Sequence, residues 1–197
     1  MLGMDFQLQA LEEALETLGA ILEDRRTPYE LLAVGGSSLL LLGLIDRPTG
    51  DLDIIALLES GAFHKLDELP EPLSEAAGQV AAALGLAGNW MNTGPASLLD
   101  FGLPEGWEGR LVTRKYGGLC LNLPAREDQI CLKLYAAVDR GPNDKHFEDL
   151  KKLAPTEPEL VFAAQWTVTH DPSEAFRGEL LKCLSAMGAE LTNADLS

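Results

Sequence analysis

Hydrophobic residues near the N-terminus recur every three or four positions, which predicts an amphipathic helix over residues 4–26. The apolar stripe consists of Leu8, Leu11, Leu15, Leu18 and Leu22. Glutamates occupy the other side, and Thr27-Pro28 ends the pattern. We therefore expect a helix that packs one face against the core of the protein.

A more hydrophobic pattern follows in residues 31–57. An apolar run at 31–34 predicts a buried strand, and two glycines then lead into an apolar stretch at 37–44 that predicts a buried helix. Residues 46–50 are rich in turn formers, and a second apolar run begins beside two aspartates. The segment therefore predicts a strand, a short helix and a second strand.

The rest of the chain predicts more helices around a few strands. Residues 59–87 read as mostly helical with an interruption at Pro70 and Pro72, and Ser74 is the expected N-cap of the helix that follows. Short strands are expected at 97–101, 110–116 and 119–123, the last two joined by a turn at Gly117-Gly118. Further helices are expected at 126–138, 143–153, 157–169 and 172–188, the last with Asp171 as its N-cap. This layout indicates an α/β (α+β) core over residues 1–123 and a helical C-terminal part over 124–190.

The two aspartates at the start of the second strand carry the candidate chemistry. Asp51 and Asp53 share one face of an extended chain, because side chains alternate along a strand. Two adjacent carboxylates are costly unless a cation lies between them, and Mg²⁺ prefers one or two carboxylates together with substrate phosphates. Gly35-Gly36, followed by Ser37, offers backbone N–H groups to an anion. Together they suggest a site for a nucleoside triphosphate and its metal.

Each of these signals also has a purely structural interpretation. The glycine pair alone is typical of a tight strand-to-helix turn. Asp51 alone is typical of a turn residue, and Asp53 of an exposed acid in a strand. The two motifs become specific through their spacing, because residues 37–50 are long enough for a short helix and a return to an adjacent strand.

Composition narrows the class of protein further. The formal net charge of -16 makes binding to duplex nucleic acid unlikely, because such binding depends on Lys and Arg neutralising phosphates. The longest apolar run, at 39–45, is too short to span a membrane. The three cysteines fit neither a disulfide framework nor a zinc site, and the N-terminus lacks a secretory pattern. We therefore expect a cytoplasmic protein.

The pattern Val34-Gly35-Gly36-Ser37, followed by Thr49-Gly50-Asp51-Leu52-Asp53-Ile54, resembles the signature of the DNA polymerase beta-like nucleotidyltransferase superfamily. The runs at 126–137, 139–140 and 144–150 further resemble the AbiEii-like group, which includes uncharacterised minimal nucleotidyltransferases and toxins of toxin–antitoxin pairs. His146 departs from that group, which commonly has Asp at this position.

The resemblance implies a small mixed sheet and transfer of a nucleotidyl group that depends on Mg²⁺ or Mn²⁺. Asp51 and Asp53 are implied to hold the metal, with Asp100 as a third acid on a later strand. The residues implied to bind the nucleotide are Gly35, Gly36, Ser37 and Thr49. Lys133 and Asp149 are implied to be functional, Lys133 either as a neutraliser of triphosphate charge or as a helix lysine lying over the core.

Two functions remain open from the sequence. The first is an enzyme that moves a nucleotidyl group from a nucleoside triphosphate to an unknown acceptor, with an antitoxin protein as partner if it is a toxin. The second is a nucleotidyltransferase fold with little or no catalysis that acts as a binding module or nucleotide sensor in a toxin–antitoxin or regulatory complex.

Overall fold

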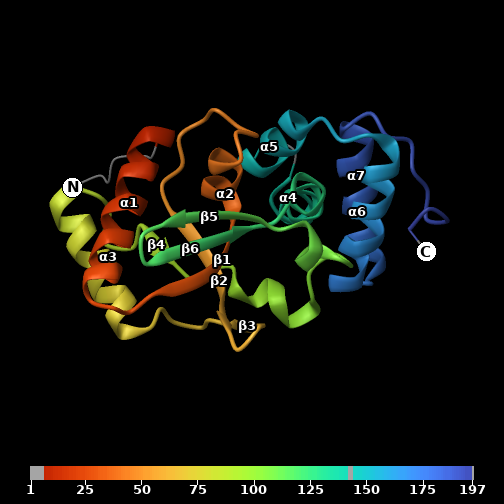
Figure 1. Ribbon diagram of the computed structural model, residues 1–197. Helices are drawn as coiled ribbons and strands as arrows, with labels where there is room; N and C mark the ends of the chain where they lie inside the picture. Colours follow the sequence, from red (N-terminus) through yellow and green to blue (C-terminus); the bar gives the residue numbers. More distant parts are fainter. Residues whose placement is uncertain (1–6, 142–143, 197) are drawn as a thin grey trace. The chain divides into compact units, whose positions relative to one another are not determined.

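The computed structural model describes residues 7–141 and 144–196, which form two compact units (Figure 1). The first unit contains the chain up to Gly102 together with Glu108–Pro124, and the second contains Leu103–Trp107 and the chain from Ala125 onward. The limits expected from the sequence, 1–123 and 124–190, stay a prediction, because compact packing does not show that either part folds alone.

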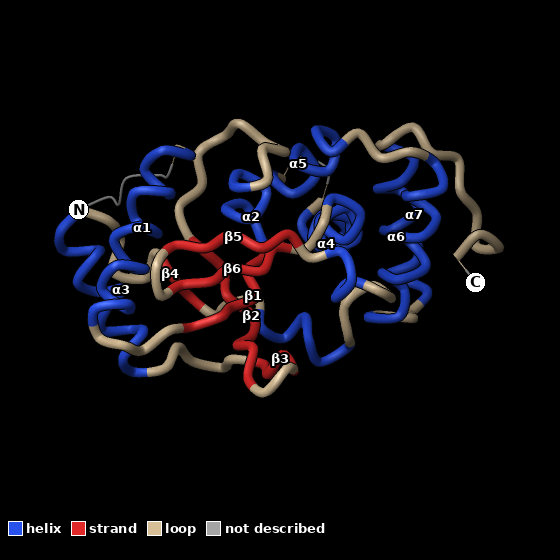
Figure 2. Tube along the Cα trace, viewed as in Figure 1, coloured by secondary structure: helices blue, strands red, loops and turns tan. Residues whose placement is uncertain are grey.

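A mixed six-stranded sheet forms the centre of the first unit (Figure 2). Its strand order is β3-β2-β1-β6-β5, and β4 pairs with β2. The strands are β1 (Tyr29–Val34), β2 (Leu52–Glu59), β3 (Ala62–Lys65), β4 (Met91–Asn92), β5 (Val112–Tyr116) and β6 (Leu119–Leu123). The pairs β1–β6 and β2–β4 are parallel and the other three are antiparallel, which confirms the expected small mixed sheet.

Strands β1 and β2 are joined in a register with one irregularity. Leu32 lies opposite Ala56, but the next residue, Ala33, lies opposite Ile54, so β2 contains one more residue than β1 over this stretch. Such an extra residue is a β-bulge, which bends the strand and changes the direction of the side chains beyond it. Val34 consequently lies opposite Asp53.

Three α-helices belong to the described part of this unit: the first two pack on the sheet, and the third packs on the first. They are α1 (Leu8–Asp24), α2 (Gly35–Leu41) and α3 (Glu71–Leu84), and α1 and α3 lie side by side in Figure 1. The predicted leucine stripe of α1 is buried except for Leu8, as expected of a packing helix. Gly19 lets α1 approach the sheet closely, because a Cβ there would lie 1.7 Å from the carbonyl oxygen of Tyr116.

The second unit is helical. Its helices are α4 (Arg126–Arg140), α5 (Lys145–Leu153), α6 (Glu157–His170) and α7 (Glu174–Ala186), and α4 packs against each of the other three. A capping box starts α6. The Thr156 side chain accepts a hydrogen bond from the Glu159 backbone N–H, and the Glu159 carboxylate accepts one from the Thr156 backbone N–H. In the part of the chain that the structure describes, no helix is long and apolar enough to cross a membrane.

Several predicted elements are wrong in type or limits. Residues 97–101 lie in a 3-10 helix, η1 (Ala96–Phe101), rather than a strand, and a second one, η2 (Trp107–Arg110), precedes β5. Residues 62–65 form β3 within the stretch expected to be helical. Helix α2 already starts at Gly35 and ends at Leu41. The predicted helix starts at 4–6 and at 143 lie outside the described residues.

The caps of two helices also differ from expectation. Pro70 is the N-cap of α3 and Pro72 lies in its first turn, where a missing N–H costs nothing, so the prolines start the helix and Ser74 lies inside it. In α7 the cap is Ser173, whose side chain accepts a hydrogen bond from the Phe176 N–H. Asp171 instead accepts from the Ser173 N–H in the turn before it.

Candidate functional site

The glycine pair lies against the second aspartate of the sequence motif. Gly35 follows β1 directly and has a φ of +80°, a conformation that side chains other than glycine rarely adopt. A Cβ at this position would lie 2.3 Å from Oδ2 of Asp53. Two separate reasons therefore require glycine at position 35: its positive φ, and the space beside its Cα that the Asp53 carboxylate occupies.

The second glycine faces the turn that precedes β2. A Cβ on Gly36 would lie 2.8 Å from Oγ1 of Thr49 and 3.3 Å from Nη2 of Arg47. Arg47 is half-buried, and its Nη1 donates a hydrogen bond of 3.0 Å to the carbonyl of Pro48. A guanidinium group, a hydroxyl and a carboxylate thus lie within a few ångströms of two successive glycines.

Two hydroxyl groups hold the backbone at Asp51. Oγ of Ser37, which is fully buried, donates a hydrogen bond to the Asp51 carbonyl, and Oγ1 of Thr49 lies 3.5 Å from the same oxygen. These contacts tie the start of α2 to the start of β2. Both hydroxyls therefore position the Asp51 backbone, and contacts from Ser37 or Thr49 to a nucleotide stay a prediction.

The acidic pair has the orientation expected from strand alternation. Leu52 and Ile54 are completely buried, whereas Asp51 and Asp53 keep part of their surface in solvent. Two partly exposed carboxylates, a neighbouring guanidinium and a glycine turn form a donor set that suits a magnesium–triphosphate complex, because Mg²⁺ in such sites takes one or two carboxylates and completes its shell with phosphates and water.

Asp100 is held elsewhere in the first unit. It lies in η1, and both its carboxylate oxygens accept hydrogen bonds from Nζ of Lys65, at 2.8 and 2.9 Å. Over residues 7–141 and 144–196 no group of three or more His, Cys, Asp and Glu side chains is arranged to hold a metal. The structure therefore does not bring Asp100 to Asp51 and Asp53, and its role as a metal ligand stays a prediction.

Lys133 and Asp149 meet inside the second unit. Nζ of Lys133, on α4, lies 2.8 Å from Oδ2 of Asp149, on α5, and the two side chains are 3% and 0% exposed. A buried ion pair of this kind ties two helices together, since either charge alone would be costly in the interior. Within this unit the geometry supports a packing role, and a functional role for the pair stays a prediction.

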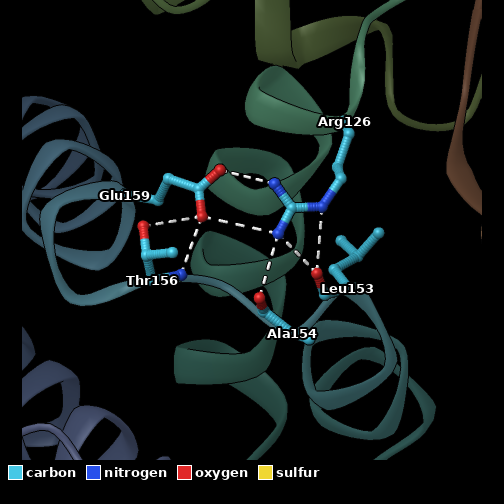
Figure 3. Close-up of polar contacts among 5 residues, drawn as sticks. All are labelled: Arg126, Leu153, Ala154, Thr156 and Glu159. Atoms are coloured by element: carbon cyan, nitrogen blue, oxygen red, sulfur yellow. Dashed lines mark hydrogen bonds and ion pairs between the residues drawn. The ribbon is translucent and has the colours of Figure 1, made fainter.

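An arginine joins the end of α5 to the start of α6 (Figure 3). Arg126 donates hydrogen bonds to the carbonyl oxygens of Leu153 and Ala154 and to the carboxylate of Glu159. The Arg126 side chain, with the hydrogen bonds from Thr156, lowers the pKa of Glu159 to about 2. The C-terminal carbonyls of α5 and the capping box of α6 are thus held by one guanidinium group.

Arg47 is a site residue that the sequence pattern does not reveal. It lies in a turn dense in proline and glycine, where a charged residue is usually solvated. Only the fold brings its guanidinium against Gly36. The only sequence feature that could have pointed to Arg47 is its position, because it is the single arginine between the buried helix and the two acids.

A family model described as nucleotidyltransferase of unknown function (DUF6036) matches residues 8–156. The chain belongs to this family. No curated protein and no solved structure matches it. The narrower resemblance to the AbiEii-like group stays a prediction.

The family match runs from the first turn of α1 to the residue before α6. It therefore includes every candidate residue of this nucleotidyltransferase family member, from Gly35 to Asp149, and leaves α6 and α7 outside. The shared part of the family is the sheet unit together with the first two helices of the second unit.

The contact between Gly35 and Asp53 leads to a stability prediction for this family member. Gly35→Ala is expected to lower the free energy of unfolding by about 2–4 kcal/mol, from the positive φ and from the overlap with the carboxylate. Gly85→Ala is the matched control, because Gly85 has a φ of +70° with no heavy atom within 4 Å of the added Cβ. It should cost only about 1 kcal/mol. If urea unfolding shows the same loss of stability in Gly35→Ala and Gly85→Ala, the Asp53 carboxylate does not add to the cost of a side chain at position 35.

His146 predicts a pH dependence of stability. Burial and the charge of Lys133 lower its pKa from 6.5 to about 4, against the opposing pull of Asp144 and Asp149. The unfolded chain therefore binds a proton at this residue below pH 6.5, and the folded chain only below about pH 4. Stability falls as the pH drops through this window, by up to about 3 kcal/mol.

The measurement is urea unfolding at pH 7, 5.5 and 4 for the wild type and for His146→Asn. The variant should lose less stability than the wild type over this range. His64→Asn, at an exposed histidine of β3, is the matched control and should follow the wild type. Parallel curves for all three proteins would contradict the assignment to His146.

Proposed function

We propose that this family member transfers a nucleotidyl group from a nucleoside triphosphate to an acceptor, with a divalent metal held by Asp51 and Asp53. The observation that carries the proposal is the packing of the Asp53 carboxylate against Gly35, next to Arg47 and Thr49 against Gly36. An acidic pair and a cation beside one glycine turn match the two needs of a metal–triphosphate complex, which are oxygen ligands for the metal and a positive group for the phosphates.

In this proposal each residue has a separate task. Gly35 and Gly36 let a phosphate approach the backbone, and Arg47 neutralises part of its charge. Ser37 and Thr49 keep the Asp51 backbone in place. A bound Mg²⁺ or Mn²⁺ supplies a Lewis acid that stabilises the charge on the reacting phosphate. A bond forms between the acceptor and the α-phosphorus, the bond to the β-phosphate breaks, and pyrophosphate leaves.

The test uses the purified chain with each of the four ribonucleoside triphosphates, labelled at the α-phosphate, and an extract that contains RNA, protein and small molecules. Label should appear in a new product with Mg²⁺ or Mn²⁺ and not with EDTA. Arg47→Met should weaken binding of the metal–triphosphate complex, whereas Arg177→Met, an arginine of α7, should not. Absence of both transfer and metal-dependent triphosphate binding would refute the proposal.

A second candidate is a nucleotide-binding module with little or no catalysis, in a complex with an antitoxin or another regulatory partner. One observation favours it: across the described ranges, 7–141 and 144–196, no three acidic or other ligating side chains converge. Metal-dependent binding of a triphosphate without label transfer to any acceptor would support this second function over the first.

A further inference from the structure

The short strand β4 brings one more polar side chain to the acidic pair. β4 pairs with β2 in parallel, with Leu52 opposite Met91 and Asp53 opposite Asn92. Directly paired residues in a sheet point to the same face, and neighbouring strands lie about 4.8 Å apart. Asn92 is therefore the nearest side-chain neighbour that β4 gives to Asp53.

The position of Asn92 is firmly fixed by its surroundings. Trp90, two residues earlier, is completely buried and donates an indole hydrogen bond of 2.9 Å to the carbonyl of Ala77 on α3. Thr93, the next residue, donates a hydrogen bond of 2.8 Å to the carbonyl of Asp67. Both flanks of Asn92 are therefore anchored, so its side chain projects from a rigid strand and not from a loop.

The carboxamide of Asn92 is also oriented. Its Oδ1 accepts a hydrogen bond of 2.8 Å from the backbone N–H of Gly94. The amide group Nδ2 is not used in this turn, and it is a hydrogen-bond donor that an incoming oxygen can meet. Asn92 is half-buried, so part of the residue is exposed to solvent.

We propose that Asn92 belongs to the same site and makes it bind a divalent metal as its triphosphate complex and only weakly as the bare ion. This inference rests on the proposed function. Two carboxylates and a neutral amide bring less negative charge than three carboxylates, so the phosphates must supply the remaining ligands. The Nδ2 donor of Asn92 then meets an oxygen of the triphosphate.

The test replaces Asn92 by Asp, which keeps the acceptor for the Gly94 N–H, removes the Nδ2 donor and adds a third carboxylate beside Asp53. Binding of Mn²⁺ alone, and of Mn²⁺ with each of the four ribonucleoside triphosphates, is measured by calorimetry. The wild type should bind Mn²⁺ at least tenfold more tightly with the preferred triphosphate than without it. Asn92→Asp should bind Mn²⁺ alone about tenfold more tightly than the wild type.

Gln79→Glu on α3 is the matched control, because it makes the same change from amide to carboxylate at an exposed position. Its Mn²⁺ affinity should stay within twofold of the wild type, and urea unfolding should show that both variants are folded. The inference about Asn92 is overturned if Asn92→Asp raises the affinity for Mn²⁺ alone no more than Gln79→Glu does. It is also overturned if the wild type binds Mn²⁺ alone as tightly as it binds Mn²⁺ together with a triphosphate.

The inference and the proposed function fail in different ways. Triphosphate-dependent Mn²⁺ binding by the wild type with no response in Asn92→Asp would remove Asn92 from the site and leave the function standing. Loss of triphosphate binding in all proteins, including the wild type, would overturn both.

Discussion

Replacing Asp53 by Asn is expected to lower the rate of nucleotidyl transfer on the order of 10³-fold, because the metal then loses a charged ligand that stabilises the transition state by several kcal/mol. The variant keeps the size and shape of the side chain, so the contact with Gly35 should survive. Asp51→Asn should have a comparable effect. The measurement is the rate of label transfer from the α-phosphate at saturating triphosphate.

Asp67→Asn is the matched control for this experiment. Asp67 is 86% exposed and lies in the same unit, so its replacement should leave the rate within about twofold of the wild type. Urea unfolding of all variants separates loss of chemistry from loss of fold. A rate for Asp53→Asn within tenfold of the wild type would show that this carboxylate is not a metal ligand.

Lys133→Met is expected to lower the free energy of unfolding by about 3–5 kcal/mol, because it removes the ion-pair partner of a carboxylate that is completely buried. The double variant with Asp149→Leu should regain much of this loss, since two apolar side chains then fill the same space. Unfolding in urea, followed by circular dichroism, measures both changes.

Lys151→Met is the control, because Lys151 and Glu148 form an exposed pair on α5 at 2.7 Å. Exposed pairs contribute about 0–1 kcal/mol, so this variant should be nearly as stable as the wild type. If Lys133→Met costs no more than Lys151→Met, the buried pair does not hold α4 to α5.

Elements with a clear hydrophobic pattern were predictable from the sequence, whereas β4 and η1 were not. The leucine stripe of α1 and the apolar strands β1 and β6 appear where the pattern places them. The two-residue strand β4 has no period of its own, because it exists only through pairing with β2. The apolar stretch of η1 is too short to separate a strand from a helical turn, so its prediction as a strand was wrong.

The same distinction holds for the site. Asp51 and Asp53 could be assigned to one face because alternation is a local property of a strand. Arg47 could not be found, since its position against Gly36 depends on the path of a turn. Asp100 is an acid in the part of the chain where the resemblance implies a third metal ligand, but its partner Lys65 lies on β3, a strand that the sequence does not reveal.

The extra residue in β2 determines which side of the sheet carries the acids. If β1 and β2 kept a regular register from Leu32 and Ala56, Asp53 would face the opposite side and would not lie across from Val34. One further residue between Asp53 and Ala56, in a ladder that keeps a single bulge, would therefore turn both carboxylates away from the glycine turn with no change in the acids themselves. A substitution in this strand affects one side chain, whereas an inserted residue reverses the face of every side chain before it, so we expect relatives of this chain to tolerate insertions elsewhere and not between Asp53 and Ala56.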